Sequence, residues 1–135
     1  MLRYLLDTNL CIRVLRDRPQ SIRERFNAEA DGLCISTVVL TELYHGAAKS
    51  ARPVENRAEV ERFANRLAVL PFDEAAAAHA GDIRAALEAE GRPIGGYDVL
   101  IAGHARSRGL IVVTGNLREF TRVDGLRCED WLPAS

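Results

Sequence analysis

The chain alternates short apolar runs with longer segments whose apolar residues recur every three or four positions. Short apolar runs are typical of buried strands, and the longer spacing is typical of helices. Strands are expected at residues 2–6, 33–35, 69–72, 110–113 and 126–128. Helices are expected around 12–16, from 19 to 31–32, over 37–47, 53–67, 74–90 and 97–108, and as one turn at 117–120. This alternation favours an α/β fold with a parallel sheet covered on both faces.

Several residues mark where these elements begin and end. Asp73 is expected to cap the alanine-rich helix, and Gly91 and Gly109 are expected to end the two helices that precede them. Pro71 lies within the third apolar run, and it indicates an edge strand or a strand end because proline cannot donate a hydrogen bond to a neighbouring strand.

Length and composition indicate one soluble domain over residues 1–135. Hydrophobic residues make up 47% of the chain and charged residues 27%, which excludes disorder as the main state. A net charge of −1 excludes a strongly basic nucleic-acid coat. All but one of the 18 basic residues are arginines, a bias that suits RNA or an acidic partner and that a GC-rich genome would also produce.

The N-terminal apolar stretch is too short for a signal peptide or a membrane span. The three cysteines, Cys11, Cys34 and Cys128, show no C-x-x-C spacing, so neither a disulfide framework nor a zinc ribbon is indicated. We therefore expect a cytoplasmic protein with no membrane association.

Polar side chains that can bind a metal follow the predicted strands. Asp7 directly follows the first strand, and Glu42 lies about two turns into the helix after the second. Asp98 lies in the first turn of the helix that leads into the strand at 110–113, and Asn116 follows that strand. Because ligands bind at the carboxyl ends of strands in open α/β sheets, these four side chains are expected to converge.

Clustered carboxylates repel one another unless protons or a cation neutralise them. Oxygen donors with water suit Mg²⁺ or Mn²⁺ rather than zinc, and such an ion can activate water toward a phosphodiester. Each residue also has a structural interpretation: Asp7 as a helix cap, Asp98 as a partner of its helix dipole, Glu42 as a solvated side chain and Asn116 as a turn residue.

The sequence resembles the PIN-domain nucleases and, more narrowly, the enteric-type branch of the VapC toxins of toxin–antitoxin modules. The matching stretches are residues 5–9, 35–43 and 97–102, with the most specific block at 91–110, 118–120 and 129–131. The resemblance implies a PIN-like three-layer α/β/α sandwich with a short parallel sheet. It also implies a metal-dependent endoribonuclease whose acidic site is Asp7, Glu42 and Asp98.

The same resemblance implies further partners and site residues. Family members often carry another acid after the last long strand, where this chain has Asn116, with Glu119 three residues on. The implied substrate is initiator tRNA, cut in the anticodon region. The implied protein partners are a cognate VapB antitoxin, whose C-terminal tail covers the active site, and a second copy of the toxin within a larger complex.

As a mechanism, we expect Mg²⁺, replaceable by Mn²⁺, to be held mainly by Asp7 and Asp98, with attack by metal-activated water. Glu42 and Asn116 would hold the ion directly or through water. Auxiliary side chains are expected to orient the carboxylates: Thr8 and Asn9 for Asp7, and Ser36 or Thr37 for Glu42. Arginines are candidates for phosphate contacts: Arg92, Arg106, Arg108 and Arg118.

Other interpretations make different demands on the sequence. A phosphorelay receiver needs a lysine after a late strand, and Lys49 is far from such a place. A haloacid-dehalogenase-type phosphatase needs a second aspartate where this chain has Asn9. A catalytically impaired PIN-like domain that only binds a partner stays open, because Asn116 is uncharged.

Overall fold

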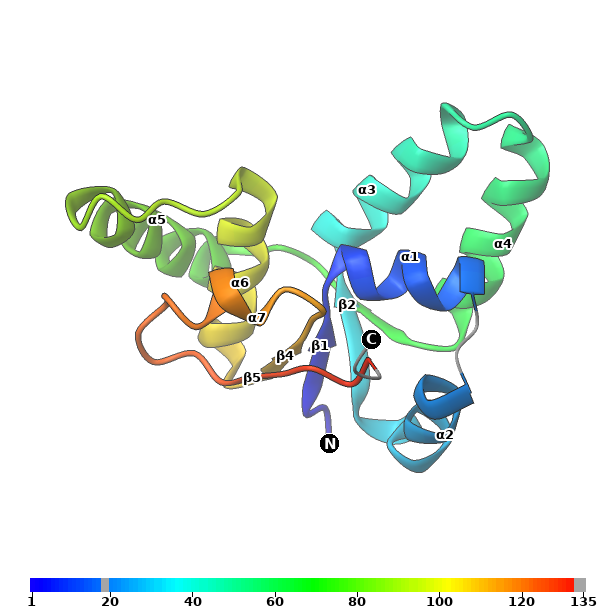
Figure 1. Cartoon of the computed structure of the whole chain (residues 1–135), viewed down its shortest axis with the longest axis horizontal. Coiled ribbons are helices and arrows are strands. Elements are labelled where there is room, and N and C mark those ends of the chain that lie inside the picture. Colours follow the sequence, from blue (N-terminus) through cyan, green and yellow to red (C-terminus); the bar gives the residue numbers. More distant parts are fainter. Residues whose placement is uncertain (18–19, 133–135) are drawn as a thin grey trace.

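The structure, a computed structural model that describes residues 1–17 and 20–132, is built on a parallel sheet (Figure 1). The described strands lie in the order β3-β2-β1-β4-β5, and each neighbouring pair is parallel. Their bounds are β1 Tyr4–Leu6, β2 Leu33–Ser36, β3 Ala68–Leu70, β4 Ile111–Val113 and β5 Cys128–Glu129. The predicted α/β class with a short parallel sheet is confirmed.

Helices cover both faces of this sheet, as the three-layer prediction requires. In Figure 1, α1, α3 and α4 lie on one side of the strands, and α5 and α6 lie on the other. The helices are α1 Thr8–Asp17, α2 Gln20–Ala28, α3 Thr37–Ala48, α4 Pro53–Asn65, α5 Glu74–Ala89, α6 Gly96–Arg108 and α7 Leu117–Phe120, with a 3₁₀ turn η1 at Ala30–Gly32. Within the described ranges, no helix has the length and apolar character needed to cross a membrane.

Several predicted boundaries were wrong by a few residues. The first strand begins at Tyr4 rather than at residue 2, and the last covers 128–129 rather than 126–128, because pairing with β4 begins at Cys128. The third strand ends at Leu70, before Pro71, and it is an edge strand as predicted. The second helix ends at Ala28, and the η1 turn follows. Its predicted start at residue 19 lies outside the described residues.

Local capping interactions mark the helix ends, and those at Asp73 and Gly109 match the sequence-based expectation. The Ser36 hydroxyl accepts a hydrogen bond from the Val38 N–H at 3.1 Å and caps α3. Asp73 caps α5 by accepting from the Ala76 N–H at 3.0 Å. Gly109 follows α6 in the left-handed conformation, with φ of 66°, which glycine adopts without a steric penalty.

The central strand β1 determines where a ligand site can form. β1, β2 and β4 are buried along their whole length. β1 pairs with β2 along one edge and with β4 along the other. The connections that follow β1 and β4 therefore diverge, and such a switch point in a parallel sheet places a crevice at the carboxyl end of β1. The Asp7 N–H donates to the Val113 carbonyl at 3.0 Å and continues the pairing of β1 with β4 up to this crevice.

The α5–α6 contact requires a glycine on α6, and this gives a stability prediction. A Cβ at Gly103 would lie 2.5 Å from the Ala80 backbone nitrogen and 2.6 Å from its Cα. We expect Gly103→Ala to lower the free energy of unfolding by about 1–3 kcal/mol, because neither backbone can move away without disturbing the helix pair. Urea unfolding followed by circular dichroism measures this change.

Gly81→Ala on α5 is the matched control for Gly103→Ala. A Cβ at Gly81 meets no atom within 4 Å, so this variant is expected to raise stability by about 0.5–1 kcal/mol through the higher helix propensity of alanine. Equal effects of the two alanines would contradict the proposed close contact.

Candidate metal centre and catalytic site

Asp7 is the most deeply placed acid of the candidate site. It is 1% exposed, and both carboxylate oxygens accept hydrogen bonds. Oδ1 accepts from the Leu10 N–H at 2.9 Å, and Oδ2 accepts from the Thr114 hydroxyl at 2.5 Å. The bond to Leu10 means that Asp7 also caps α1, so its structural and functional interpretations are compatible. The role of Thr114 was missed, although its place directly after β4 could have indicated it.

Burial raises the pKa of Asp7 from 3.8 to about 6. The hydrogen bonds from Thr114 and Leu10 oppose this rise by stabilising the charged form. The negative charges of Glu42 and Asp130 raise the pKa further. Asp130 lies beyond β5 and is an additional acid near this site that the sequence analysis did not identify.

Asp98, in the first turn of α6, is half-buried and lies against a second acid, Glu119. Burial is the main cause that raises its pKa to about 7, followed by a hydrogen bond with Glu119 and the charge of Glu119. The negative charges of Asp7 and Glu42 raise the pKa of Asp98 further, so these three carboxylates repel one another. The Asn116 amide nitrogen donates to Glu119 Oε2 at 3.0 Å and fixes that carboxylate beside Asp98.

Glu42 on α3 is oriented by a residue that was expected to serve a different carboxylate. The Thr8 hydroxyl donates to Glu42 Oε1 at 2.5 Å, so the prediction that Thr8 orients Asp7 was wrong in its partner. Asn9 lies on the same turn of α1 and lines the cavity described below. Within the described residues its side chain makes no hydrogen bond to Asp7.

Ser36 and Thr37 do not orient Glu42, contrary to expectation. The Ser36 hydroxyl caps α3 and hydrogen-bonds to His104 Nδ1 at 2.8 Å, while the Thr37 hydroxyl accepts from the Phe72 N–H at 3.1 Å. His104 is fully buried, and burial lowers its pKa. Because Ser36 is the N-cap residue directly before α3 and His104 lies on α6, this bond links the start of the helix that carries Glu42 to the helix that carries Asp98.

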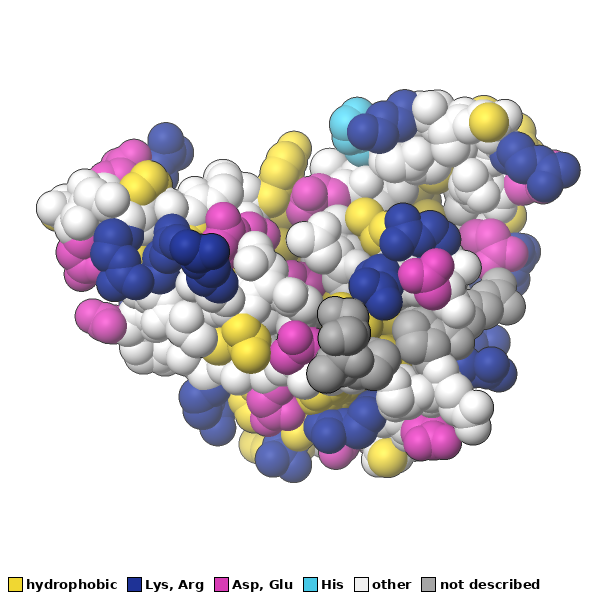
Figure 2. Space-filling model, viewed as in Figure 1, with side chains coloured by type: hydrophobic (Ala, Val, Ile, Leu, Met, Phe, Trp, Pro, Cys, Tyr) yellow, Lys and Arg dark blue, Asp and Glu magenta, His cyan; other side chains and the backbone are white. Residues whose placement is uncertain are grey.

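A cavity of about 240 Å³ lies beside these acids. It is lined by Thr8, Asn9, Glu42, Gly95, Gly96, Tyr97 and Asp98. Figure 2 shows acidic side chains gathered between the two groups of helices on this face. Among residues 1–17 and 20–132, no ion pair joins a basic side chain to any of the neighbouring acids: Asp7, Glu42, Asp98, Glu119 and Asp130.

This donor set fits a hard divalent cation. In the described part of the chain, no three Asp, Glu, His or Cys side chains are close enough to enclose a metal by themselves. Mg²⁺ does not need such an enclosure, because it keeps several waters and is usually bound through one or two carboxylates. Asp7 and Asp98 offer only oxygen donors, and burial and neighbouring negative charges raise the pKa of both, an effect that a bound cation would oppose.

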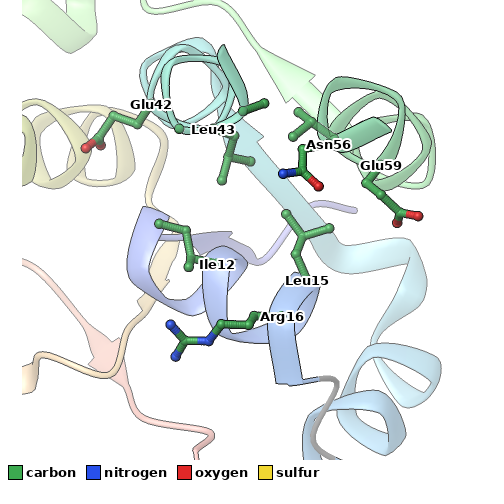
Figure 3. A pocket seen from close by; sticks show the side chains of 10 residues that line it. Ile12, Leu15, Arg16, Glu42, Leu43, Asn56 and Glu59 are labelled. Carbon is green, nitrogen blue, oxygen red and sulfur yellow. The ribbon is translucent and has the colours of Figure 1, made fainter. Parts of the chain in front are cut away.

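A second cavity, of about 340 Å³, is an apolar groove between α1, α3 and α4. Figure 3 shows Ile12, Leu15 and Leu43 pointing into the groove, while the Glu42 carboxylate points away from it. Ile12 and Leu15 are thus groove residues. Phe26 does not line the groove and packs against Phe63 and Trp131.

The candidate phosphate-binding arginines separate into two groups. Arg92 is exposed in the loop before α6, and Arg118 is exposed next to Glu119. Arg106 and Arg108 lie near the opposite end of α6 from Asp98, about 12–15 Å away at the usual helical rise. Arg106 also donates to His79 Nδ1 at 3.0 Å and to the Asp124 carbonyl at 2.9 Å, so it is engaged within the fold.

The raised pKa values predict how the stability of the metal-free protein depends on pH. A raised pKa favours the neutral acid in the folded state. The stability that each neutral acid contributes to the folded protein is fully present below pH 3.8. It is lost as the pH rises through the folded-state pKa, which is about 6 for Asp7 and about 7 for Asp98. Between pH 5 and 8 the free energy of unfolding should fall, and Asp7→Asn should remove about 1–2 kcal/mol of that fall.

Urea unfolding in EDTA at several pH values measures this dependence. Asp82→Asn, at an exposed position on α5, is the charge-matched control. It should keep the wild-type dependence of the free energy of unfolding on pH. If the free energy of unfolding of Asp7→Asn depended on pH as it does in wild type, burial of Asp7 would not destabilise its charged form.

Comparison with known proteins gives a consistent result over nearly the whole chain. The model of the PIN domain family matches residues 4–126. A tRNA(fMet)-specific endonuclease VapC of Shigella flexneri is 56% identical over 131 residues, which cover 97% of this chain and 99% of that protein. A ribonuclease VapC2 of Haemophilus influenzae is 49% identical and covers 98% of this chain and 100% of that protein.

Solved structures agree with these relatives. A chain in the crystal structure of DNA-bound VapBC from Salmonella typhimurium superposes with a TM-score of 0.96 at 55% identity, covering 98% of this chain and all of that one. A chain of VapBC2 from Rickettsia felis superposes with a TM-score of 0.93 at 33% identity, covering 97% of this chain and all of that one. The chain therefore belongs to the PIN domain family and, within it, to the VapC nucleases of toxin–antitoxin systems.

Proposed function

We propose that this VapC chain is an Mg²⁺-dependent endoribonuclease and that residues 1–135 act as one PIN domain in the cytoplasm. One observation carries the proposal: Glu42 and Asp98 line one cavity at the carboxyl end of the sheet, and their negative charges and that of Asp7 act on one another. No basic side chain of the described residues forms an ion pair with these acids. Family membership supports the same conclusion, since PIN-domain nucleases depend on divalent metal ions.

Asp7 and Asp98 are the residues proposed to hold Mg²⁺, or Mn²⁺ in its place, with Glu42 and Asn116 contributing directly or through water. When bound, such an ion supplies Lewis acidity toward a phosphodiester and lowers the pKa of water. The protein's part is orientation. Thr114 and the Leu10 N–H fix Asp7, and Thr8 fixes Glu42.

Glu119 takes the place of the missing acid at Asn116 in this proposal. It lies against Asp98, and the Asn116 amide holds it there. Because the pKa of Asp98 is raised to about 7, its proton has to leave before its carboxylate can bind a cation. Arg92 and Arg118 are proposed to contact RNA phosphates near the cavity, and Arg106 and Arg108 only phosphates farther along the RNA.

Initiator tRNA, cut in the anticodon region, is the proposed substrate. Support comes from the Shigella relative, whose name specifies tRNA(fMet). A cognate VapB antitoxin is the proposed inhibitor, because similar chains are found in VapBC complexes. Its tail could follow the apolar groove of Ile12 and Leu15 as far as Glu42, which lines both cavities. We also propose that the toxin forms a homodimer within the complex.

A catalytically impaired binding module is the second candidate, and the uncharged Asn116 favours it. The two proposals differ in metal-dependent cleavage. For the nuclease, Asp7→Asn and Asp98→Asn should each reduce RNA cleavage by at least about 100-fold while the fold is retained, because each removes a charge needed to hold the cation. Asp82→Asn should cleave like wild type. Gel assays of RNA cleavage with Mg²⁺ or with EDTA measure the rates.

The chemistry of the new RNA ends tests the proposed attack by water. Hydrolysis leaves 5′-phosphate and 3′-hydroxyl ends, whereas attack by the ribose 2′-hydroxyl leaves a 2′,3′-cyclic phosphate. Cyclic phosphate ends, or cleavage that persists in EDTA, would contradict the metal-dependent hydrolysis proposed here.

The substrate proposal is tested separately, by sequencing RNA ends after brief expression of the chain without an antitoxin. We expect new ends in the anticodon loop of initiator tRNA and none in cells that express Asp98→Asn. New ends confined to other RNAs would refute the substrate and leave the nuclease proposal intact.

A further inference from the structure

Tyr97 is an exposed aromatic residue at the edge of the acid-lined cavity. Its side chain lies next to Asp98 in sequence, lines the same cavity and is 53% exposed. The other large hydrophobic residues exposed in the described ranges, Met1, Ile12 and Val54, are not aromatic. Tyr97 is thus the one aromatic side chain in the described structure that combines high exposure with a place at this site.

The local sequence keeps both the ring and the cavity accessible. Gly95 and Gly96 line the cavity with backbone only, and a Cβ at Gly95 would lie 3.2 Å from Asp98 Oδ2. A larger residue at position 95 would therefore press on that carboxylate. Within the described residues, the Tyr97 ring makes no ring-stacking or cation–π contact and its hydroxyl makes no hydrogen bond.

The cavity's other side chains do not offer a comparable surface. Thr8, Asn9, Glu42 and Asp98 are all polar, so Tyr97 provides the cavity's only aromatic face. Unpaired nucleobases stack on such faces whatever their identity, and single-stranded RNA is commonly recognised in this way. A phosphodiester placed at Asp7 and Asp98 would bring an adjacent base within reach of the residue next to Asp98.

We propose that Tyr97 stacks on an unpaired nucleobase that flanks the phosphodiester to be cut. This inference rests on the proposed ribonuclease function and adds a substrate-binding residue to it. Stacking of this kind tolerates different bases, so Tyr97 would select for unpaired RNA and add affinity without reading the base. A protein partner is the other occupant to consider. The described apolar groove, which includes Ile12, lies between α1, α3 and α4, and Tyr97 does not line it.

The test pairs a protein change with an RNA change. The probe is a short RNA hairpin that contains the bond cut by wild type, with one flanking nucleotide made abasic in turn. We expect Tyr97→Ala to raise the half-saturating RNA concentration by about 5- to 100-fold in single-turnover cleavage, with a smaller effect on the rate at saturation. Tyr97→Phe keeps the ring and should restore most of the affinity. Val54→Ala, on α4, is the control for truncating an exposed side chain.

The decisive result is the coupling between the two changes. If Tyr97 stacks on a flanking base, the abasic RNA loses affinity for wild type but loses little further for Tyr97→Ala. Independent losses at every flanking position, or normal cleavage by Tyr97→Ala with weakened antitoxin binding, would overturn the inference. Absence of cleavage by wild type itself would refute the proposed function, a result distinct from a failure of Tyr97 alone.

Discussion

The repulsion between buried carboxylates is the constraint on which this site depends. Asp7 is nearly inaccessible to water, and the charges of Glu42 and Asp130 act on it. Asp98 is half-buried against Glu119. Without a cation, the protein relieves this repulsion by keeping protons on some of the acids at pH values where exposed carboxyls are charged. The same groups that make the metal-free site unfavourable make it selective for a hard cation with oxygen ligands.

The fold supports this arrangement through short-range interactions at the ends of strands. β1 lies in the middle of the sheet, and the residues after β1 and β4 meet across a single hydrogen bond between Asp7 and Thr114. The Ser36–His104 bond joins the helices that carry Glu42 and Asp98. Glycine at position 103 allows α6 to approach α5 closely. Rigid helices therefore hold acids that would otherwise move apart.

Much of this architecture could be predicted from the sequence, because strand burial and helix periodicity are local signals. The strand at 110–113 was placed within one residue of where it occurs, and Asp73 caps α5 as predicted. One rule about parallel sheets predicted that Asp7, Glu42 and Asp98 converge, and in the structure the charges of these acids act on one another. The bounds of the strands at the edges of the sheet were harder to predict. Pairing with β4, and not local apolarity, decides that β5 includes Cys128 and Glu129.

The hydrogen-bond partners of the acids could not be predicted, because they come from distant parts of the chain. Thr8 is adjacent to Asp7 in sequence yet donates to Glu42, 34 residues away. Thr114 reaches Asp7 across 107 residues. Ser36 looked like a partner of Glu42 but bonds to His104, 68 residues on. The spatial positions of the arginines relative to the site could not be predicted from composition either. The structure places Arg118 beside Glu119 and Arg108 at the end of α6 that is far from Asp98.

The most direct test of the central claim is calorimetric titration of the protein with Mn²⁺ in buffers of different ionisation enthalpy, from pH 6 to pH 8. Because the pKa values of Asp7 and Asp98 are raised to about 6 and about 7, a cation that binds there has to displace protons. Binding should release protons near pH 6.5, release fewer at pH 8, and be lost in Asp7→Asn. Binding without proton release, or undiminished binding to Asp7→Asn, would contradict a cation held by these carboxylates.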